Sequence, residues 1–138
     1  MSDMKTVEND ADPAAFLASV ENRGRAEDAA AVTNMMARVT GLPPRMWGDS
    51  IIGFGAYDYK RRDGSAHRFF LTGVSPRKQK LTIYIMPGFK PYQEILSRLG
   101  PHKHSASCLL LGRLAKVNLA VLEELVAASV SDMRAEYS

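Results

Sequence analysis

The sequence has little of what a disulfide-stabilised or membrane-spanning protein needs. Its single cysteine, Cys108, excludes an intramolecular disulfide and favours a reducing, cytoplasmic compartment. Its apolar runs fall far short of the roughly 20 residues that a helix needs to cross a bilayer. Residues 1–12 carry four carboxylates and no apolar stretch, unlike a secretory signal. We therefore expect a soluble cytoplasmic protein with no membrane partner.

Size and composition predict one folded domain. The chain has 138 residues, of which 46% are apolar and 24% charged, as in average globular proteins. No repeat, low-complexity segment or internal linker interrupts it. We expect residues 1–11 to form a flexible lead-in and residues 12–138 to form a single α+β domain.

Positive charge is concentrated in the middle of the chain. The net charge is only +3, yet residues 51–104 hold ten Lys or Arg against three Asp or Glu, whereas both ends are slightly acidic. Such asymmetry steers an anionic partner toward one region of the surface. A nucleic-acid partner is not expected, because the sequence lacks a dense basic run.

Helices are predicted near both ends of the chain. Asp12-Pro13 is typical of a helix start, and a second helix over 25–40 ends at Gly41. Apolar residues at steps of three and four predict a third helix over 92–99, and Asn118 caps a fourth.

Strands are predicted between these helices, at 51–60, 67–74, 80–86 and 108–111, with a polar loop over 101–107. Arg62-Asp63-Gly64-Ser65 favours a hairpin turn. In the third strand, Leu81, Ile83 and Ile85 should face one side of the sheet and the alternate residues the other, and one of these two faces should pack on helices. The element order, approximately ααβββαβα, predicts an α+β fold with an antiparallel sheet packed on helices.

A glycine-rich and aromatic segment over 46–59 is the first candidate site. Strand alternation places Gly53, Gly55, Tyr57 and Tyr59 on one side, where a flat floor beside two phenols could receive a ligand. The glycines equally suit a bulge or close packing. The segment is not a dinucleotide fingerprint, since Asp58 occupies the third glycine position.

A basic turn over 75–80 is the second candidate. Arg77 offers a planar fork and Lys78 a mobile charge for phosphate or carboxylate. The alternative is a solvated turn whose charges protect sheet edges. Joined to the first segment, this turn predicts a ligand-binding face. Its predicted residues are Trp47, Gly53, Gly55, Tyr57, Tyr59, Ser75, Arg77, Lys78 and Tyr84.

Metal-binding and catalytic patterns are weak. His102, His104 and Cys108 match no common zinc spacing, and Cys108 fits a buried, inert thiol better than a nucleophile. Carboxylates in and around the first two helices could hold Fe²⁺ weakly, although a solvated helix face also explains them. We predict no catalytic residue and no cofactor.

Several motifs in order resemble the YdhG-like family of small uncharacterised bacterial proteins. They are Met46-Trp47-Gly48, Ile52 to Gly55, Thr72 to Lys78, Leu81 to Phe89 and Ser107-Cys108-Leu109. The resemblance implies a compact α+β fold and an undefined biochemical role. Some relatives are described as frataxin-like iron chaperones, which implies iron on acidic residues of the leading helix. This chain departs from the pattern at Ala106, where relatives more often carry a lysine.

Two functions follow as expectations. The first is a non-enzymatic binding module for a small anionic ligand or a protein partner, which includes a second copy of the chain. The alternative is a frataxin-like intracellular iron chaperone that uses acidic helix residues. A reactive thiolate at Cys108 would instead indicate an enzyme.

Overall fold

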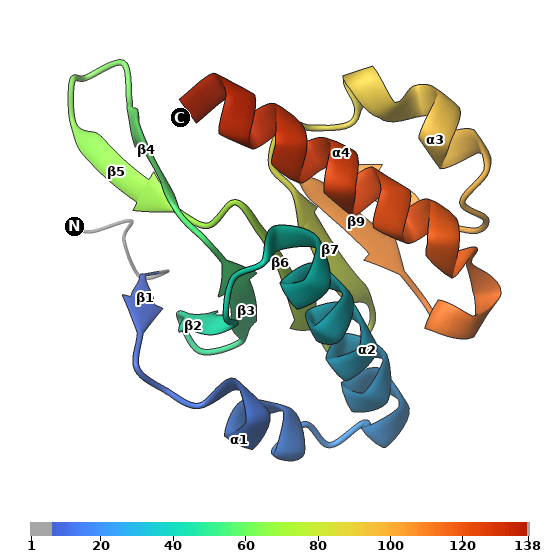
Figure 1. The fold of residues 1–138 in the computed structure, drawn as a ribbon. Coiled ribbons are helices and arrows are strands. Elements are labelled where there is room, and N and C mark those ends of the chain that lie inside the picture. Colours follow the sequence, from blue (N-terminus) through green and yellow to red (C-terminus); the bar gives the residue numbers. More distant parts are fainter. Residues whose placement is uncertain (1–6, 138) are drawn as a thin grey trace.

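A seven-stranded antiparallel sheet with two long helices on one face forms the body of the protein (Figure 1). The computed structural model describes residues 7–137. The strand order in the sheet is β1-β2-β3-β6-β7-β9-β8, and β4 and β5 form a separate hairpin. The strands are β1 (Glu8–Asn9), β2 (Arg45–Trp47), β3 (Ile51–Phe54), β4 (Tyr57–Lys60), β5 (Ala66–Phe69), β6 (Thr72–Pro76), β7 (Leu81–Ile85), β8 (Lys103–Ser105) and β9 (Cys108–Leu111). The predicted α+β class is confirmed.

Three predicted helix ends have the expected caps. The second helix, however, begins at Arg23 and not at residue 25, and the third is α-helical only over Gln93–Ser97 of the predicted 92–99. Asp12 accepts the Ala14 N–H at the start of α1, and Asn118 accepts the Val121 N–H at the start of α4. Gly41 ends α2 in the left-handed conformation, with φ of 71°. The helical elements are α1 (Pro13–Ala18), α2 (Arg23–Thr40), η1 (Lys90–Tyr92), α3 (Gln93–Ser97), η2 (Leu114–Lys116) and α4 (Leu119–Tyr137).

The main core lies between the sheet and helices α2 and α4. Leu81, Ile83 and Ile85 of β7 are fully buried in it, which confirms the predicted alternation of that strand. A smaller cluster on the other face joins Trp47, Ile51, Phe70 and Tyr84, all from strands or the loop before β6. The helices therefore cover one face of the sheet, and side chains of the strands and of that loop cover the other.

Two predicted strands are each divided. The span 51–60 breaks into β3 and β4 because Gly55, with φ of 67°, turns the chain away from the sheet. The span 67–74 breaks into β5 and β6 around Phe70 and Leu71. The Leu71 N–H still donates to the Phe54 carbonyl oxygen at 3.0 Å. The predicted turn is confirmed: Gly64 has φ of 87°, and Asp63 accepts the Ser65 N–H.

Three short strands lie outside the predicted spans: β2, which pairs with β3 inside the sheet, and the edge strands β1 and β8. β1 falls in the expected lead-in over 1–11, of which residues 1–6 lie outside the described residues, and β8 falls in the expected loop over 101–107. The approximate order ααβββαβα therefore lacks these strands and the divisions above. Neither edge strand has a buried residue, so neither carries the alternating apolar pattern from which a strand is recognised.

Candidate anion-binding site

Arg25, in the first turn of α2, is a buried cation without an acidic partner. Its residue is 8% exposed, and its Nη1 donates to the carbonyl oxygens of Arg77 at 2.7 Å and Lys78 at 3.3 Å. Its Nε is buried with no hydrogen-bond partner. Within residues 7–137, no carboxylate forms an ion pair with it.

This environment is costly for a guanidinium group. A buried charge needs both hydrogen bonds and a counter-charge to offset the loss of hydration. The two carbonyl groups satisfy one nitrogen of Arg25 and supply no net negative charge. An anion beside Arg25 would supply what is missing.

An open hollow of about 580 Å³ lies beside this guanidinium group, and we call it the Arg25 hollow. Arg77 and Lys78, both exposed, join Arg25 in lining it, so it gathers three cations. Glu21, also exposed, is the one carboxylate among its described lining residues. The lining residues are Phe16, Ser19, Val20, Glu21, Asn22, Arg25, Pro76, Arg77 and Lys78.

The position of the hollow at the start of α2 adds to its positive potential. Asn22, the N-cap of this 18-residue helix, is one of the lining residues. Backbone N–H groups and the helix dipole favour an anion at such an end. The same dipole disfavours the two arginines, Arg23 and Arg25, that occupy the first turn.

The turn between β6 and β7 holds Arg77 and Lys78 in place. The Arg77 N–H donates to the Ser75 and Lys80 carbonyls, and the Ser75 hydroxyl donates to the Ser50 carbonyl at 2.6 Å. Ser75 is fully buried and is not one of the residues that line the Arg25 hollow. Its hydrogen bond to Ser50 stabilises the start of the turn. Arg77 also donates from Nη2 to the Tyr84 hydroxyl at 3.1 Å.

The predicted glycine floor is filled by the chain's own rings. Gly53 and Gly73 face each other on β3 and β6. A Cβ atom on Gly53 would lie 2.7 Å from Cδ1 of Trp47, and one on Gly73 would lie 3.2 Å from the Phe70 ring. Trp47 is only 2% exposed. Close packing, the alternative to a ligand floor, is what these two glycines serve.

Three other residues of the predicted face lie apart from the basic turn. Gly55 stands at the break after β3, and Tyr57 and Tyr59 belong to the separate β4–β5 hairpin. The Tyr57 ring lies 4.5 Å from that of Tyr137 at the end of α4. Burial, with smaller contributions from Tyr137 and Tyr59, raises the pKa of Tyr57 to about 12. The structure thus unites Arg77 with Tyr84, and Arg77 and Lys78 with Arg25, but not all nine predicted residues.

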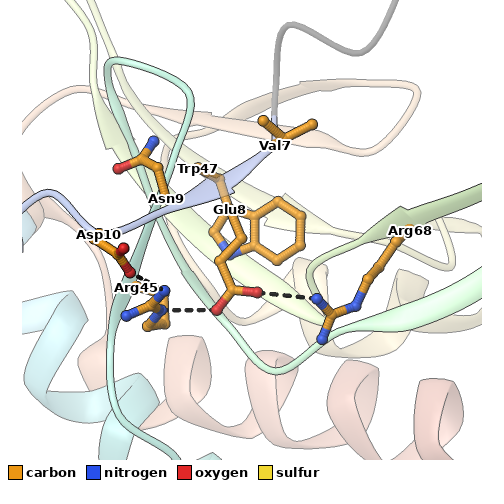
Figure 2. A pocket seen from close by; sticks show the side chains of 7 residues that line it. All are labelled: Val7, Glu8, Asn9, Asp10, Arg45, Trp47 and Arg68. Atoms are coloured by element: carbon orange, nitrogen blue, oxygen red, sulfur yellow. Dashed lines mark hydrogen bonds and ion pairs between the residues drawn. The ribbon is translucent and has the colours of Figure 1, made fainter.

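A second hollow, of about 300 Å³, lies over Trp47 (Figure 2). Carboxylates of the chain already neutralise the two arginines that line it. The Glu8 carboxylate of β1 accepts from Arg45 Nε at 2.7 Å and Arg68 Nη1 at 3.1 Å. Asp10 accepts from Arg45 Nη2 at 3.0 Å, and these bonds raise the pKa of Arg45. An external anion would have to displace two carboxylates here, so this hollow is the weaker candidate.

Three of the carboxylates in and around the first two helices pair with arginines. Glu8 and Asp10 bind arginines as above, and Asp28 accepts from Arg113 Nε at 2.9 Å and the Leu114 N–H at 3.0 Å. In the part of the chain that the structure describes, no three His, Cys, Asp or Glu side chains converge as metal ligands. The described residues therefore give the iron hypothesis no support.

Within residues 7–137, His102 and His104 contact groups other than the Cys108 thiol. His104 stacks on Phe89 with ring centres 4.4 Å apart, and His102 Nδ1 lies 2.8 Å from the Gly100 carbonyl oxygen. Cys108 is half-buried, and burial raises the pKa of its thiol while Arg77 lowers it. A raised pKa favours the neutral thiol over the thiolate, which agrees with the prediction that Cys108 is not an activated nucleophile.

Comparison with protein-family models, curated proteins and solved structures found no match. The resemblance to the YdhG-like family stays a prediction from the sequence. No helix over residues 7–137 is long and apolar enough to cross a bilayer.

Sequence reasoning missed Arg25. The signal was present, since Asn22 caps a helix whose first turn holds two arginines against the dipole. Arg23 satisfies its Nη1 on three carbonyl groups around the end of α1. Which of the two arginines is buried without a carboxylate is visible only in three dimensions.

Proposed function

We propose that this protein is a non-enzymatic binding module that takes a small anionic ligand, a phosphate or carboxylate group, in the Arg25 hollow. The observation that carries the proposal is the buried guanidinium group of Arg25, which has no carboxylate partner in the described chain. Arginine is suited to such a group because its planar fork matches phosphate and carboxylate oxygens.

The cations of the hollow have different roles in this proposal. Arg25 is fixed, because its bonds to the Arg77 and Lys78 carbonyls tie α2 to the β6–β7 turn. Arg77 and Lys78 are exposed and extend from that same turn. The Lys78 side chain can adjust to the ligand, whereas Arg77 would exchange its hydrogen bond to the Tyr84 hydroxyl for one to the anion. A pre-organised charge at the base with adaptable charges at the rim lowers the ordering cost of binding.

Titration calorimetry with inorganic phosphate tests the proposal. The wild type should bind one phosphate saturably, and the double variant Arg77→Ala/Lys78→Ala should bind it at least about tenfold more weakly, because two charge-assisted contacts are lost. The matched control is Lys60→Ala/Arg62→Ala, which removes two exposed positive charges from the β4–β5 hairpin and its turn.

The control separates a site from general attraction. Equal weakening in both double variants would reduce the effect to net charge and overturn the proposal. Unchanged binding in the Arg77/Lys78 variant would overturn it too. Thermal unfolding of each variant verifies that these surface changes leave the fold intact.

A further inference from the structure

A third hollow, which is basic and lies next to the Arg25 hollow, is lined by three lysines, and we call it the lysine hollow. Its volume is about 330 Å³, and its described lining contains no carboxylate. Three lysines reach it from separate places: Lys80 precedes β7, Lys103 begins β8, and Lys116 ends η2. The lining residues are Lys80, Pro101, His102, Lys103, Leu110, Gly112, Arg113 and Lys116.

The lysine hollow adjoins the Arg25 hollow through two structural elements. The β6–β7 turn contributes Arg77 and Lys78 to one and Lys80 to the other, and the Arg77 N–H donates to the Lys80 carbonyl at 3.1 Å. The first turn of α2 also lies between them, since a Cβ on Gly24 would be 2.8 Å from Nη1 of Arg113. The two hollows thus flank one short stretch of backbone.

Three of the four Lys and Arg side chains that line the lysine hollow have no carboxylate partner in the described part of the chain. Lys80, Lys103 and Lys116 form no ion pair with any carboxylate of residues 7–137. Arg113 alone is paired, with Asp28, and this contact raises the pKa of Arg113. Like charges around one hollow repel each other, and a bound anion would relieve that repulsion.

We infer that the ligand is a linear chain of phosphates, with one phosphate group in each hollow. The inference rests on the proposed function and extends it from one anion to two linked anions. Linking two groups raises affinity because the second one binds at a high effective concentration. A phosphate chain should therefore bind much more tightly than free phosphate.

The lining residues favour a phosphate chain over a nucleic-acid strand. Proteins that bind single strands combine positive charge with aromatic side chains on which the bases stack. The only Phe, Tyr or Trp among the described lining residues of both hollows is Phe16, and the lysine hollow has none. Positive charge from seven Lys and Arg side chains, with one Phe and one His as the only aromatic rings in the described lining, favours phosphate groups over stacked bases.

A double-mutant cycle tests the inference, with inorganic phosphate, linear polyphosphates of increasing length and a single-stranded oligonucleotide of matched phosphate number as probes. The first pair of changes is Arg77→Ala/Lys78→Ala and the second is Lys103→Ala/Lys116→Ala, all at exposed residues. The wild type should bind a polyphosphate of sufficient length at least about tenfold more tightly than phosphate. Either pair of changes should remove that advantage, so the effects of the two pairs should not add.

The outcomes distinguish the two proposals. If Lys103→Ala/Lys116→Ala leaves polyphosphate binding unchanged while phosphate still binds at the Arg25 hollow, the inference fails and the proposed function stands. If phosphate binds without dependence on Arg77 and Lys78, both fail. An oligonucleotide that binds as tightly as the matched polyphosphate would contradict the phosphate-chain assignment. Lys60→Ala/Arg62→Ala again controls for the loss of net charge.

Discussion

The Arg25 guanidinium group donates to the carbonyl oxygen of Arg77 at 2.7 Å, across 52 residues of sequence. This bond joins the first turn of α2 to the β6–β7 turn, so one side chain both supports the basic turn and supplies the buried charge beneath it. The candidate anion site therefore depends on the packing of helix against sheet and not on any local motif.

Replacing Arg25 by methionine should change stability in a ligand-dependent way. Without phosphate, the free energy of unfolding should change by no more than about 1 kcal/mol, because the lost carbonyl hydrogen bonds are offset by removal of an unpaired buried charge. With phosphate at about 100 times its dissociation constant, the wild type should gain about 2.7 kcal/mol and the variant nothing. Urea unfolding without phosphate measures the change in the free energy of unfolding, and urea unfolding with phosphate measures the gain from binding.

Arg23→Met is the matched control for this comparison. Arg23 lies in the same turn of α2, but it is exposed and bonds to carbonyl groups around the end of α1. Its variant should keep the full gain from phosphate. A gain that disappears in both variants would assign the effect to the charge of the turn and not to Arg25.

Gly53→Ala should destabilise the fold by about 1–3 kcal/mol, the usual cost of overpacking. Its new methyl group would lie 2.7 Å from Cδ1 of Trp47 and 2.9 Å from Cβ of Phe70, so at least one ring must shift. Gly112→Ala is the control, because no heavy atom lies within 4 Å of a Cβ there. Urea unfolding compares the two; equal stability in both variants would show that the rings do not pack on Gly53.

Glu8→Gln should loosen β1 from the sheet. The Glu8 carboxylate bridges Arg45 and Arg68, and the Gly48 N–H donates to the Val7 carbonyl at 3.0 Å beside it. Without the charge, hydrogen exchange of the Gly48 amide should rise severalfold while amides of β7 in the sheet interior stay protected. An unchanged Gly48 rate would mean that backbone pairing alone holds β1.

Alkylation of Cys108 should follow a thiol whose pKa lies above its ordinary value. Burial favours the neutral form of the thiol, so alkylation should be slow at neutral pH. Its rate should rise only when the pH exceeds the pKa of an ordinary thiol. Arg77→Ala removes the cation that lowers this pKa, so the midpoint of the pH–rate curve should move upward. Fast alkylation at pH 7 would instead identify a thiolate and revive an enzymatic function.

The sequence predicted those features that local chemistry determines. Asp12, Asn118 and Gly41 mark helix ends through single capping interactions, and the alternation of Leu81, Ile83 and Ile85 assigns a strand to the core. It did not predict the breaks at Gly55 and Phe70, because glycine and aromatic residues also suit a continuous strand.

In the candidate site too, local features were predicted from the sequence and contacts between distant segments were not. Arg77 and Lys78 were predicted from their cluster of charge, whereas their partner Arg25 is far away in sequence and belongs to another element. Gly53 and Trp47 were predicted as a ligand surface because composition does not reveal that the indole ring of Trp47 lies on Gly53. Contacts between distant segments decide which residues remain available to a ligand.

The most direct measurement of the central claim is the side-chain Nε–H nuclear magnetic resonance signal of Arg25 during a phosphate titration. The site predicts a saturable shift of this signal, with the same dissociation constant as calorimetry, while the Nε–H signal of Arg62 on the distant turn stays in place. Saturable phosphate binding that leaves the Arg25 signal unmoved would contradict the site.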